Sequence, residues 1–340
     1  MEDDLKQCIE EMKKYVDNGY ELTFQTYDEE PFTVDGIYQT NFHSLIPVES
    51  SSKFLSVDAS FYPLIRANNW VIGVSRCAYV IIEKVNGEWI VLSENYQDHI
   101  FPVLAPLHKR PFGIWAKLKE YESRMAVSLL DKLDKEDFCL MDGKALFGSG
   151  IGENKYSLDL YYGCRKRDVR LLMIPKKSTL QLSRNRDLLA TINRYASKLQ
   201  KEGKIGGCWI YYPITFPKVK DFYGDISCVK LSPSSNMVFR CDLMDYIVEK
   251  GKNYMVKTIS ELSTISNDPR CNGYPAPLFL AHERTRIPKA KLLEYLEKLH
   301  LKLAENGLLD FLLVEAEIAS LRRSLLGLTY DFEMVEDMEV

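Results

Sequence analysis

Several common features of protein sequences are missing from this 340-residue chain. It contains no run of 18 consecutive apolar residues, and therefore no predicted membrane-spanning helix. Its first residues, MEDDLKQCIEEMKKYV, are acidic and have the pattern of a helix, so they lack the basic start and apolar centre of a secretory signal. These absences predict a cytoplasmic protein without a membrane partner.

The eight cysteines include no CxxC pair, although zinc sites usually bring their ligands in closely spaced pairs. Several stand in apolar, strand-like runs, such as Cys139 in DFCLMDG and Cys208 in GGCWIYY. Cysteines in such runs are usually buried thiols, and disulfide frameworks are typical of much shorter secreted chains. We therefore expect buried, reduced cysteines.

The net charge of −4 argues against a nucleic-acid-binding protein that relies on bulk positive charge. This charge is unevenly distributed, because the last eleven residues, YDFEMVEDMEV, contain five acids and no base. Residues 165–186 instead contain eight bases and one acid. That segment is either a local basic face or an ordinary solvated surface, and its composition does not distinguish the two.

No internal repeat or low-complexity linker divides the chain. Strands grouped early, followed by helices that alternate with strands, predict an α/β fold with a mixed sheet. A ribonuclease H-like core flanked by helices fits this order, among other folds. We expect a strand at 19–26 and mostly loop at 27–53. Helices are expected at 1–17, at 114–134, after Pro288 and at 309–327. The predicted regions are an N-terminal extension at 1–50, a core at 51–292, and C-terminal helices with an acidic tail at 293–340.

Two aspartates stand at the ends of apolar, strand-like runs, Asp58 in FLSVDASFYPL and Asp142 in EDFCLMDG. Carboxylates at strand ends of an α/β sheet tend to converge at one edge, where their mutual repulsion favours a bound cation. The helix at 114–134 adds Glu122 on its predicted buried face, and a buried carboxylate needs a partner. Such oxygen ligands suit Mg²⁺ or Mn²⁺. For either aspartate alone, the alternative of a simple turn cap remains open.

The segment GYPAPLFLAHERTRIPKAKL adds further polar side chains. His282 follows an apolar run, with Tyr274 upstream and Arg284 downstream. A histidine beside carboxylates can bind metal or transfer protons, and an arginine can hold phosphate. A lone histidine in this position is more often a packed or capping residue, so a functional role for His282 depends on the acids lying nearby.

Taken in order, these segments resemble the NurA nucleases of archaea and bacteria. The similar segments are SVDAS, the helix with Glu122, CLMDGKAL, RLLMIPKKS, CVKLSPSSNMVFRCDL and YPAPLFLAHERTRI. The resemblance implies a ribonuclease H-like core, assembled as a ring-shaped homodimer. It also implies a Mn²⁺-dependent DNA nuclease, with Mg²⁺ as the alternative ion, that acts in DNA end resection with a hexameric HerA-type translocase. The implied activities are 5′–3′ exonuclease on single- and double-stranded DNA and endonuclease on single strands.

The resemblance also assigns roles to individual residues. Metal binding would fall to Asp58, Glu122, Asp142 and His282. Tyr274 would position the substrate, and Lys177, Arg240 and Arg284 would contact nucleic acid.

Some of these assignments remain open. Ala59 stands where NurA proteins usually have glycine, and a positive φ there would strain alanine by roughly 1 kcal/mol. Lys176 is adjacent to Lys177, and the sequence does not show which lysine faces the site. Two other functions also remain open: an inactive NurA-like subunit that docks on a translocase and clamps DNA, and another ribonuclease H-like nuclease of the Argonaute type.

Overall fold

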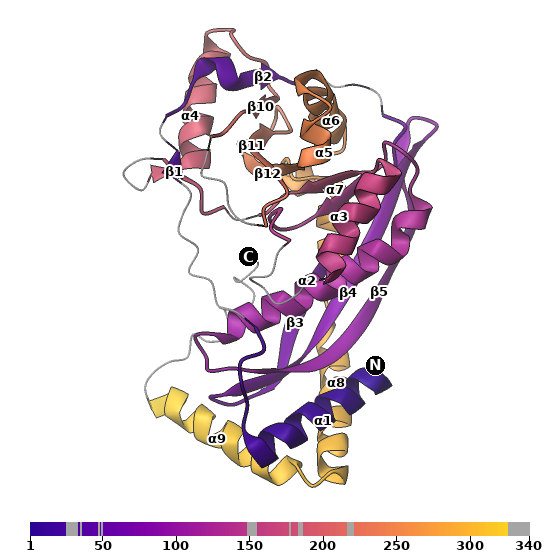
Figure 1. The fold of residues 1–340 in the computed structure, drawn as a ribbon, viewed down its shortest axis with the longest axis vertical. Coiled ribbons are helices and arrows are strands. Elements are labelled where there is room, and N and C mark those ends of the chain that lie inside the picture. The colour runs from indigo at the N-terminus through magenta and orange to yellow at the C-terminus, as the bar shows by residue number, and fades with distance from the viewer. Residues whose placement is uncertain are drawn as a thin grey trace.

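The structure is a computed structural model that describes residues 1–24, 33–34, 36–46, 48, 50–147, 155–176, 178–182, 186–215 and 221–325. A nine-stranded mixed sheet forms its centre (Figure 1). The strands of this sheet and of a second, small sheet are β1 Thr33–Val34, β2 Phe42–Ser44, β3 Phe54–Arg66, β4 Trp70–Val85, β5 Glu88–Leu104, β6 Phe138–Met141, β7 Arg170–Met173, β8 Gln181–Leu182, β9 Arg186–Asp187, β10 Trp209–Tyr211, β11 Gly224–Lys230 and β12 Phe239–Met244. The helices are α1 Glu2–Asn18, α2 Arg110–Leu129, α3 Lys155–Arg167, α4 Leu188–Lys201, α5 Asp245–Val248, α6 Lys252–Thr264, α7 Ala276–Arg284, α8 Lys289–Glu305 and α9 Leu309–Leu325.

From the edge strand β5 inward, the sheet has the strand order β5-β4-β3-β6-β7. β3, β4 and β5 form an antiparallel meander, whereas β6 and β7 run parallel to β3. Beyond β7, antiparallel pairing adds β12, β11, β10 and β2, and a separate small sheet has the order β1-β8-β9. This arrangement confirms the predicted α/β fold with a ribonuclease H-like mixed sheet.

β3 is much longer than its parallel neighbour β6, and this difference shapes the site. Asp58 is the fifth residue of β3 and not its last, which corrects the sequence prediction. The strand continues because β4 pairs with it along its length, and Phe61 beyond Asp58 is again buried. β6 pairs with β3 over Phe54–Val57 alone and ends at Met141. From Asp58 onward, β3 therefore extends past the end of β6.

The helices predicted from periodicity are present, although several others were not predicted. The predictions at 1–17, at 114–134, after Pro288 and at 309–327 correspond to α1, α2 with a following 3₁₀ turn, α8 and α9. The strand expected at 19–26 is wrong for residues 19–24, which form no strand, and residues 25–26 lie outside the described part. The expected loop at 27–53 contains the short strands β1 and β2. α3, α6 and α7 were not predicted.

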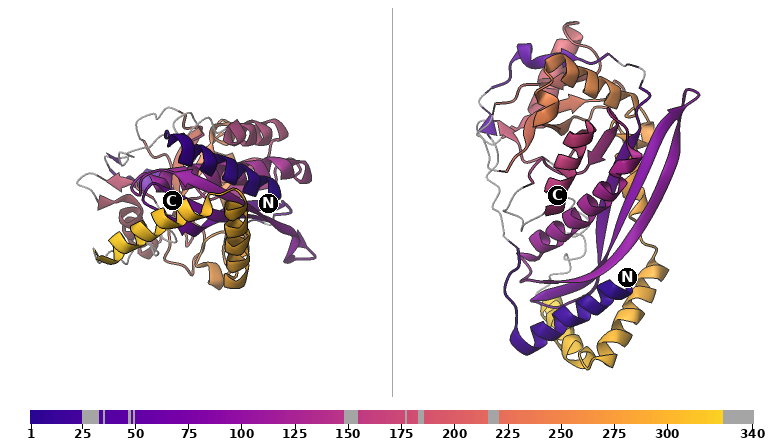
Figure 2. Two further views of the ribbon diagram at one scale, coloured as in Figure 1. Left: turned by 90° about the horizontal axis from the view of Figure 1, so that it is seen from below. Right: turned by 45° about the vertical axis from the view of Figure 1, so that its right-hand side comes forward.

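The helices α1, α8 and α9 lie together at one end of the molecule (Figures 1 and 2). Their buried faces share one apolar cluster, to which α1 contributes Met12, α8 contributes Leu299 and α9 contributes Leu312. The indole of Trp70 in β4 donates a hydrogen bond of 2.7 Å to Glu315 in α9. The two terminal extensions are thus packed on the sheet, and the predicted boundary at 292/293 falls inside α8.

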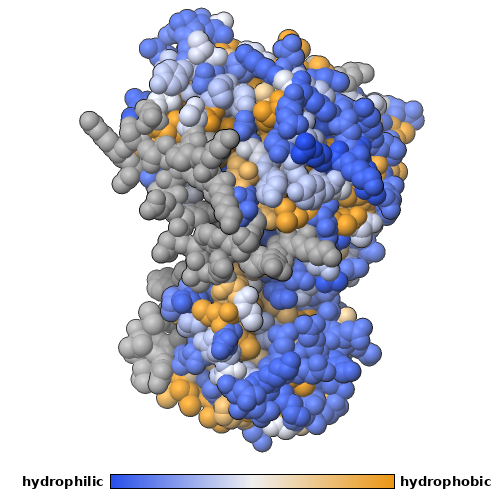
Figure 3. Space-filling view, in the orientation of Figure 1, coloured by the Kyte–Doolittle hydropathy of each residue, from blue (hydrophilic) through white to orange (hydrophobic). Residues whose placement is uncertain are grey.

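α9 also presents apolar side chains to solvent. The exposed residues are Phe311, Val314, Ile318 and Leu321, at helical steps of three and four. Figure 3 shows hydrophobic residues at the lower end of the molecule, where α9 lies. A role for the terminal helices in dimer contact or translocase docking stays a prediction.

All eight cysteines are buried and free, as predicted. In the described part of the chain, no helix is both long and apolar enough to span a bilayer. The basic segment at 165–186 does not form one uniform face, because the guanidinium of Arg170 is buried against Glu261 at 2.9 Å. By contrast, Arg165 and Arg167 in the last turn of α3 are exposed.

Candidate active site

A cavity of about 540 Å³ lies beside the part of β3 that extends past β6. α2 and α7 both pack against β3 beside it, and residues of all three elements line it. The backbone N–H of Ala59 donates a hydrogen bond of 3.1 Å to the Glu122 carboxylate in α2. Ala59 has a negative φ, since it is absent from the positive-φ residues, so alanine brings no strain to this position.

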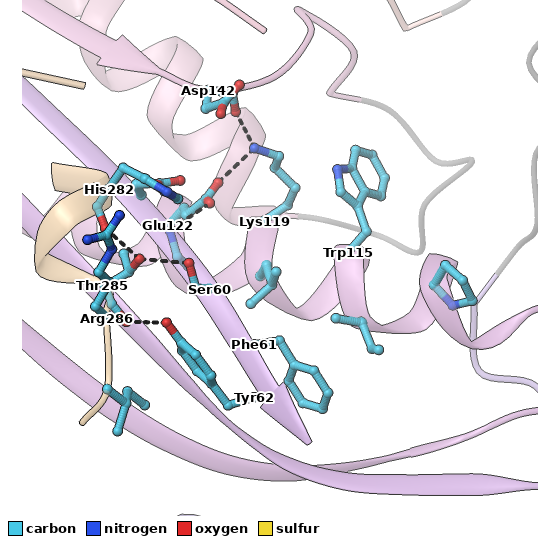
Figure 4. Close-up of a pocket in the computed structure, with 16 residues that line it drawn as sticks. Ser60, Phe61, Tyr62, Trp115, Lys119, Glu122, Asp142, His282, Thr285 and Arg286 are labelled. Carbon is cyan, nitrogen blue, oxygen red and sulfur yellow. Dashed lines mark hydrogen bonds and ion pairs between the residues drawn. The ribbon is translucent and has the colours of Figure 1, made fainter. Parts of the chain in front are cut away.

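The three predicted carboxylates, Asp58, Glu122 and Asp142, all line this cavity. Each of them is buried, with at most 7% of the residue surface exposed. Asp58 comes from β3. Glu122 comes from the buried face of α2, and Asp142 directly follows β6 (Figure 4). The convergence expected from the sequence is therefore present.

His282 completes this group from α7. Its Nδ1 lies 2.8 Å from Oδ2 of Asp58, and the imidazole also lines the cavity. The ammonium of Lys176 lies 3.2 Å from Oδ2 of Asp142, 3.9 Å from Oδ2 of Asp58 and 3.3 Å from Nδ1 of His282. Lys176 is therefore the lysine that faces the site, whereas Lys177 lies outside the described residues.

Lys119 supplies a second ammonium to the acidic group, and it was not predicted from the sequence. Its Nζ lies 2.8 Å from the Glu122 carboxylate and donates to the backbone carbonyl of Asp142 (Figure 4). Lys119 precedes Glu122 by three positions and thus occupies the same face of α2. Gly143 makes room for this contact, because a Cβ there would lie 2.9 Å from Nζ of Lys119, and its φ of 132° also favours glycine.

Burial and mutual repulsion alter the acidity of this group. Burial raises the pKa of Glu122 to about 7, and the charges of Asp58 and Asp142 add to this shift while Lys119 opposes it. Burial also raises the pKa of Asp142, again with a contribution from Asp58. Burial favours a neutral Lys119, but the neighbouring charges of Glu122 and Asp142 raise its pKa overall. The folded protein thus keeps crowded carboxylates together with cations between them.

The donor chemistry of this group fits a hard divalent ion, because it combines three carboxylates with an imidazole. Within the described residues, however, no three His, Cys, Asp or Glu side chains gather closely enough to hold a metal ion directly. The ammonium groups of Lys119 and Lys176 stand between the carboxylates instead. The residues present therefore suit a metal by type, in an arrangement that is organised around two lysines.

Other predicted site residues lie elsewhere. The hydroxyl of Tyr274 is buried and donates a hydrogen bond of 2.8 Å to the carbonyl of Ile174, so it supports the end of β7 and does not line the cavity. Arg240 has no exposed surface and forms a two-bond ion pair with Asp242, at 2.7 and 2.8 Å. These positions correct the predictions of a substrate-positioning Tyr274 and a DNA-binding Arg240.

Arg284 differs from these two residues, because its side chain is about half exposed. It forms an ion pair of 2.6 Å with Glu94 on β5. Its predicted contact with nucleic acid stays a prediction, as does the contact assigned to Lys177.

Comparison with known proteins gives matches at the level of structure. No family model matches the sequence, and no curated protein matches it. The NurA nuclease from Sulfolobus solfataricus is similar over 89% of this chain and 95% of that chain, with a TM-score of 0.50 and 15% identity. A second NurA structure covers 76% of this chain and 90% of its own length, with a TM-score of 0.46 and 10% identity. Ciona intestinalis endonuclease V bound to DNA has a TM-score of 0.42 and 12% identity, over 72% of this chain and 86% of that chain.

The similarity to the Sulfolobus solfataricus protein extends over nearly the full length of both chains. At 15% identity it describes the fold and not the activity. The fold, together with the order of the segments that carry the acidic group, leads to one conclusion: the chain has a NurA-like fold of the ribonuclease H-like type.

Proposed function

We propose that this protein is a metal-dependent nuclease that hydrolyses phosphodiester bonds in DNA. The observation that carries the proposal is the meeting of Asp58, Glu122 and Asp142 with His282 at one cavity. Four separate segments supply these groups, namely β3, α2, the residue after β6, and α7. Burying several carboxylates together is costly unless cations neutralise them. The NurA-like fold supports the same activity, since the similar Sulfolobus solfataricus protein is described as a nuclease.

Mn²⁺, or Mg²⁺ as the alternative, is the proposed ion, held by Asp58, Glu122, Asp142 and His282. When bound, such an ion activates water and stabilises the leaving oxygen of the phosphodiester. The chain's own residues prepare the site: Lys119 orients Glu122, and the backbone N–H of Ala59 holds the other carboxylate oxygen. The imidazole of His282, next to Asp58, is placed to take up or release a proton.

We further propose the activities that the NurA resemblance implies. These are 5′–3′ exonuclease on single- and double-stranded DNA and endonuclease on single strands, in DNA end resection with a HerA-type hexameric translocase. The protein would act as a homodimer. The apolar surface of α9, at the end of the molecule opposite the β10–β12 strands, is available for such an assembly (Figure 1).

The direct test is cleavage of end-labelled single- and double-stranded DNA by the purified protein. We expect cleavage with Mn²⁺ or Mg²⁺, none with chelator, and shortening from the 5′ end. The assay should be run with and without the translocase. Intact DNA under every one of these conditions, for a protein shown to be folded, would contradict the proposal.

One observation favours a second function, that of an inactive subunit which docks on a translocase and clamps DNA. The ammonium groups of Lys119 and Lys176 already neutralise the carboxylates, so the fold does not require a metal. A titration with Mn²⁺, followed by electron paramagnetic resonance of the free ion, separates the two functions. Binding of the translocase without binding of the ion would favour the inactive subunit.

A further inference from the structure

The cavity has an apolar half that the proposed hydrolysis does not use. Its volume of about 540 Å³ lies within the range of roughly 300–1,000 Å³ that is usual for ligand pockets. In β3 the lining changes from the charged Asp58 to the aromatic Phe61 and Tyr62. After His282 of α7 it continues through Thr285 and Arg286, whose guanidinium pairs with Glu283, to the apolar Ile287.

α2 carries the same gradient along one face. Its lining residues are Pro111, Ile114, Trp115, Leu118, Lys119 and Glu122. They follow one another at steps of three, one, three, one and three residues, which places them on a single side of the helix. The first four are apolar and the last two are charged, so the apolar half of the cavity lies toward the start of α2.

Three aromatic side chains line this apolar half. Phe61 is buried, whereas Tyr62 and Trp115 are only partly buried. The Tyr62 hydroxyl donates a long hydrogen bond of 3.4 Å to the carbonyl of Thr285. The buried Nε1 of Trp115 has no hydrogen-bond partner in the part of the chain that the structure describes. Figure 4 shows this nitrogen on the side of the ring that faces Lys119.

We infer that the apolar half of the cavity holds the base of one unstacked nucleotide, while the backbone phosphate of the same strand lies at the acidic end. This inference rests on the proposed function and adds the way in which the substrate is held. Aromatic faces stack on any base, so the contact is independent of sequence. The indole N–H of Trp115 has less than 1 Å² of exposed surface, so the contact with the base is made by the face of the ring and not by this N–H.

A paired, stacked base has no free face to offer Trp115. The cavity therefore takes a nucleotide from a single strand or from an end whose pairs have opened. The base contributes affinity and placement, and the groups at the acidic end contact only the backbone.

Binding without cleavage tests this inference. The full-length protein is titrated in chelator with a fluorescently labelled oligothymidylate, and with an abasic oligomer of the same length and charge. Trp115→Ala is compared with Trp115→Phe, which keeps an aromatic ring, and with Tyr38→Ala, which removes an exposed aromatic outside the cavity. Circular dichroism confirms that each variant is folded.

We expect wild type to bind oligothymidylate more tightly than the abasic oligomer. Trp115→Ala should weaken oligothymidylate binding by roughly 5- to 100-fold and leave abasic binding nearly unchanged. Trp115→Phe should keep most of the affinity, and Tyr38→Ala all of it. Equal binding of the two oligomers by wild type, or an equal loss for both in Trp115→Ala, would overturn the inference. Base-dependent binding with no cleavage under any divalent ion would instead overturn the proposed hydrolysis and leave the base site standing.

Discussion

Nδ1 of His282 lies 2.8 Å from Oδ2 of Asp58, although 224 positions separate the two residues in the sequence. The contact joins α7 to Asp58 in β3, which lies between β4 and β6 in the sheet. Asp58 and His282 were each an ambiguous signal in the sequence, since an aspartate often caps a turn and a lone histidine often packs. Their contact places both at the same cavity as Glu122 and Asp142.

Asp58→Asn should abolish DNA cleavage while the protein remains folded. The amide keeps the shape of the side chain but removes the negative charge that a divalent ion needs, so we expect a loss of at least about 100-fold. The measurement is the initial rate of cleavage with Mn²⁺. Asp131→Asn is the matched control, because Asp131 is 86% exposed and pairs only with Arg167 in the described structure. Full activity in Asp58→Asn would show that this carboxylate is not needed for cleavage.

Lys119→Met should destabilise the metal-free protein by about 3–5 kcal/mol, because it leaves buried carboxylates without their countercharge. Urea unfolding in chelator measures this loss. Lys117→Met, on the exposed side of the same helix, should cost less than about 1 kcal/mol. Mn²⁺ should stabilise Lys119→Met more than it stabilises wild type. If Lys119→Met were as stable as wild type in chelator, the Lys119 ammonium would not be needed to neutralise the buried carboxylates.

The pKa of Glu122, raised from 4.5 to about 7, predicts how stability depends on pH. Between these values the folded protein binds a proton that the unfolded chain has released, so the free energy of unfolding should fall as pH rises from about 4.5 to 7. Unfolding in chelator across this range measures the slope. Glu122→Gln cannot titrate and should flatten it. If the free energy of unfolding of Glu122→Gln fell with pH as steeply as that of wild type, the pH dependence would come from other titrating groups.

Arg240→Met should destabilise the fold without a specific effect on DNA binding. Arg240 and Asp242 have no exposed surface, and removing one partner of a buried pair costs about 3–5 kcal/mol. The double variant Arg240→Met with Asp242→Asn should lose less than the sum of the two single changes. Affinity for DNA, measured at a temperature where Arg240→Met is folded, should match wild type. A selective loss of affinity would restore the original prediction for Arg240.

The sequence predicted the parts of the site that follow from periodicity. Glu122 lies on the apolar face of a long amphipathic helix, and that pattern is visible without a structure. Asp142 stands next to a glycine at the end of a short apolar run, and it does follow β6. These features depend on neighbours within one or two turns or strands, which is the range that local patterns describe.

Contacts between distant segments account for what the sequence did not predict. Asp58 does not end β3, because pairing with β4 extends the strand through the polar and small residues that follow. Lys119 shares the helix face of Glu122, but only the meeting of α2 with the end of β6 brings its ammonium to the carbonyl of Asp142. Arg240 stands in a strand whose residues are all buried, so its charge is balanced inside the protein by Asp242.

Because β3 runs on past β6, one rigid strand carries both Asp58 and Tyr62. At about 3.3 Å per residue, their backbones are roughly 13 Å apart, and thermal motion changes that separation little within a paired strand. If a base is held beside Tyr62, the strand would fix the distance from that base to the acidic group, whatever the base sequence of the DNA.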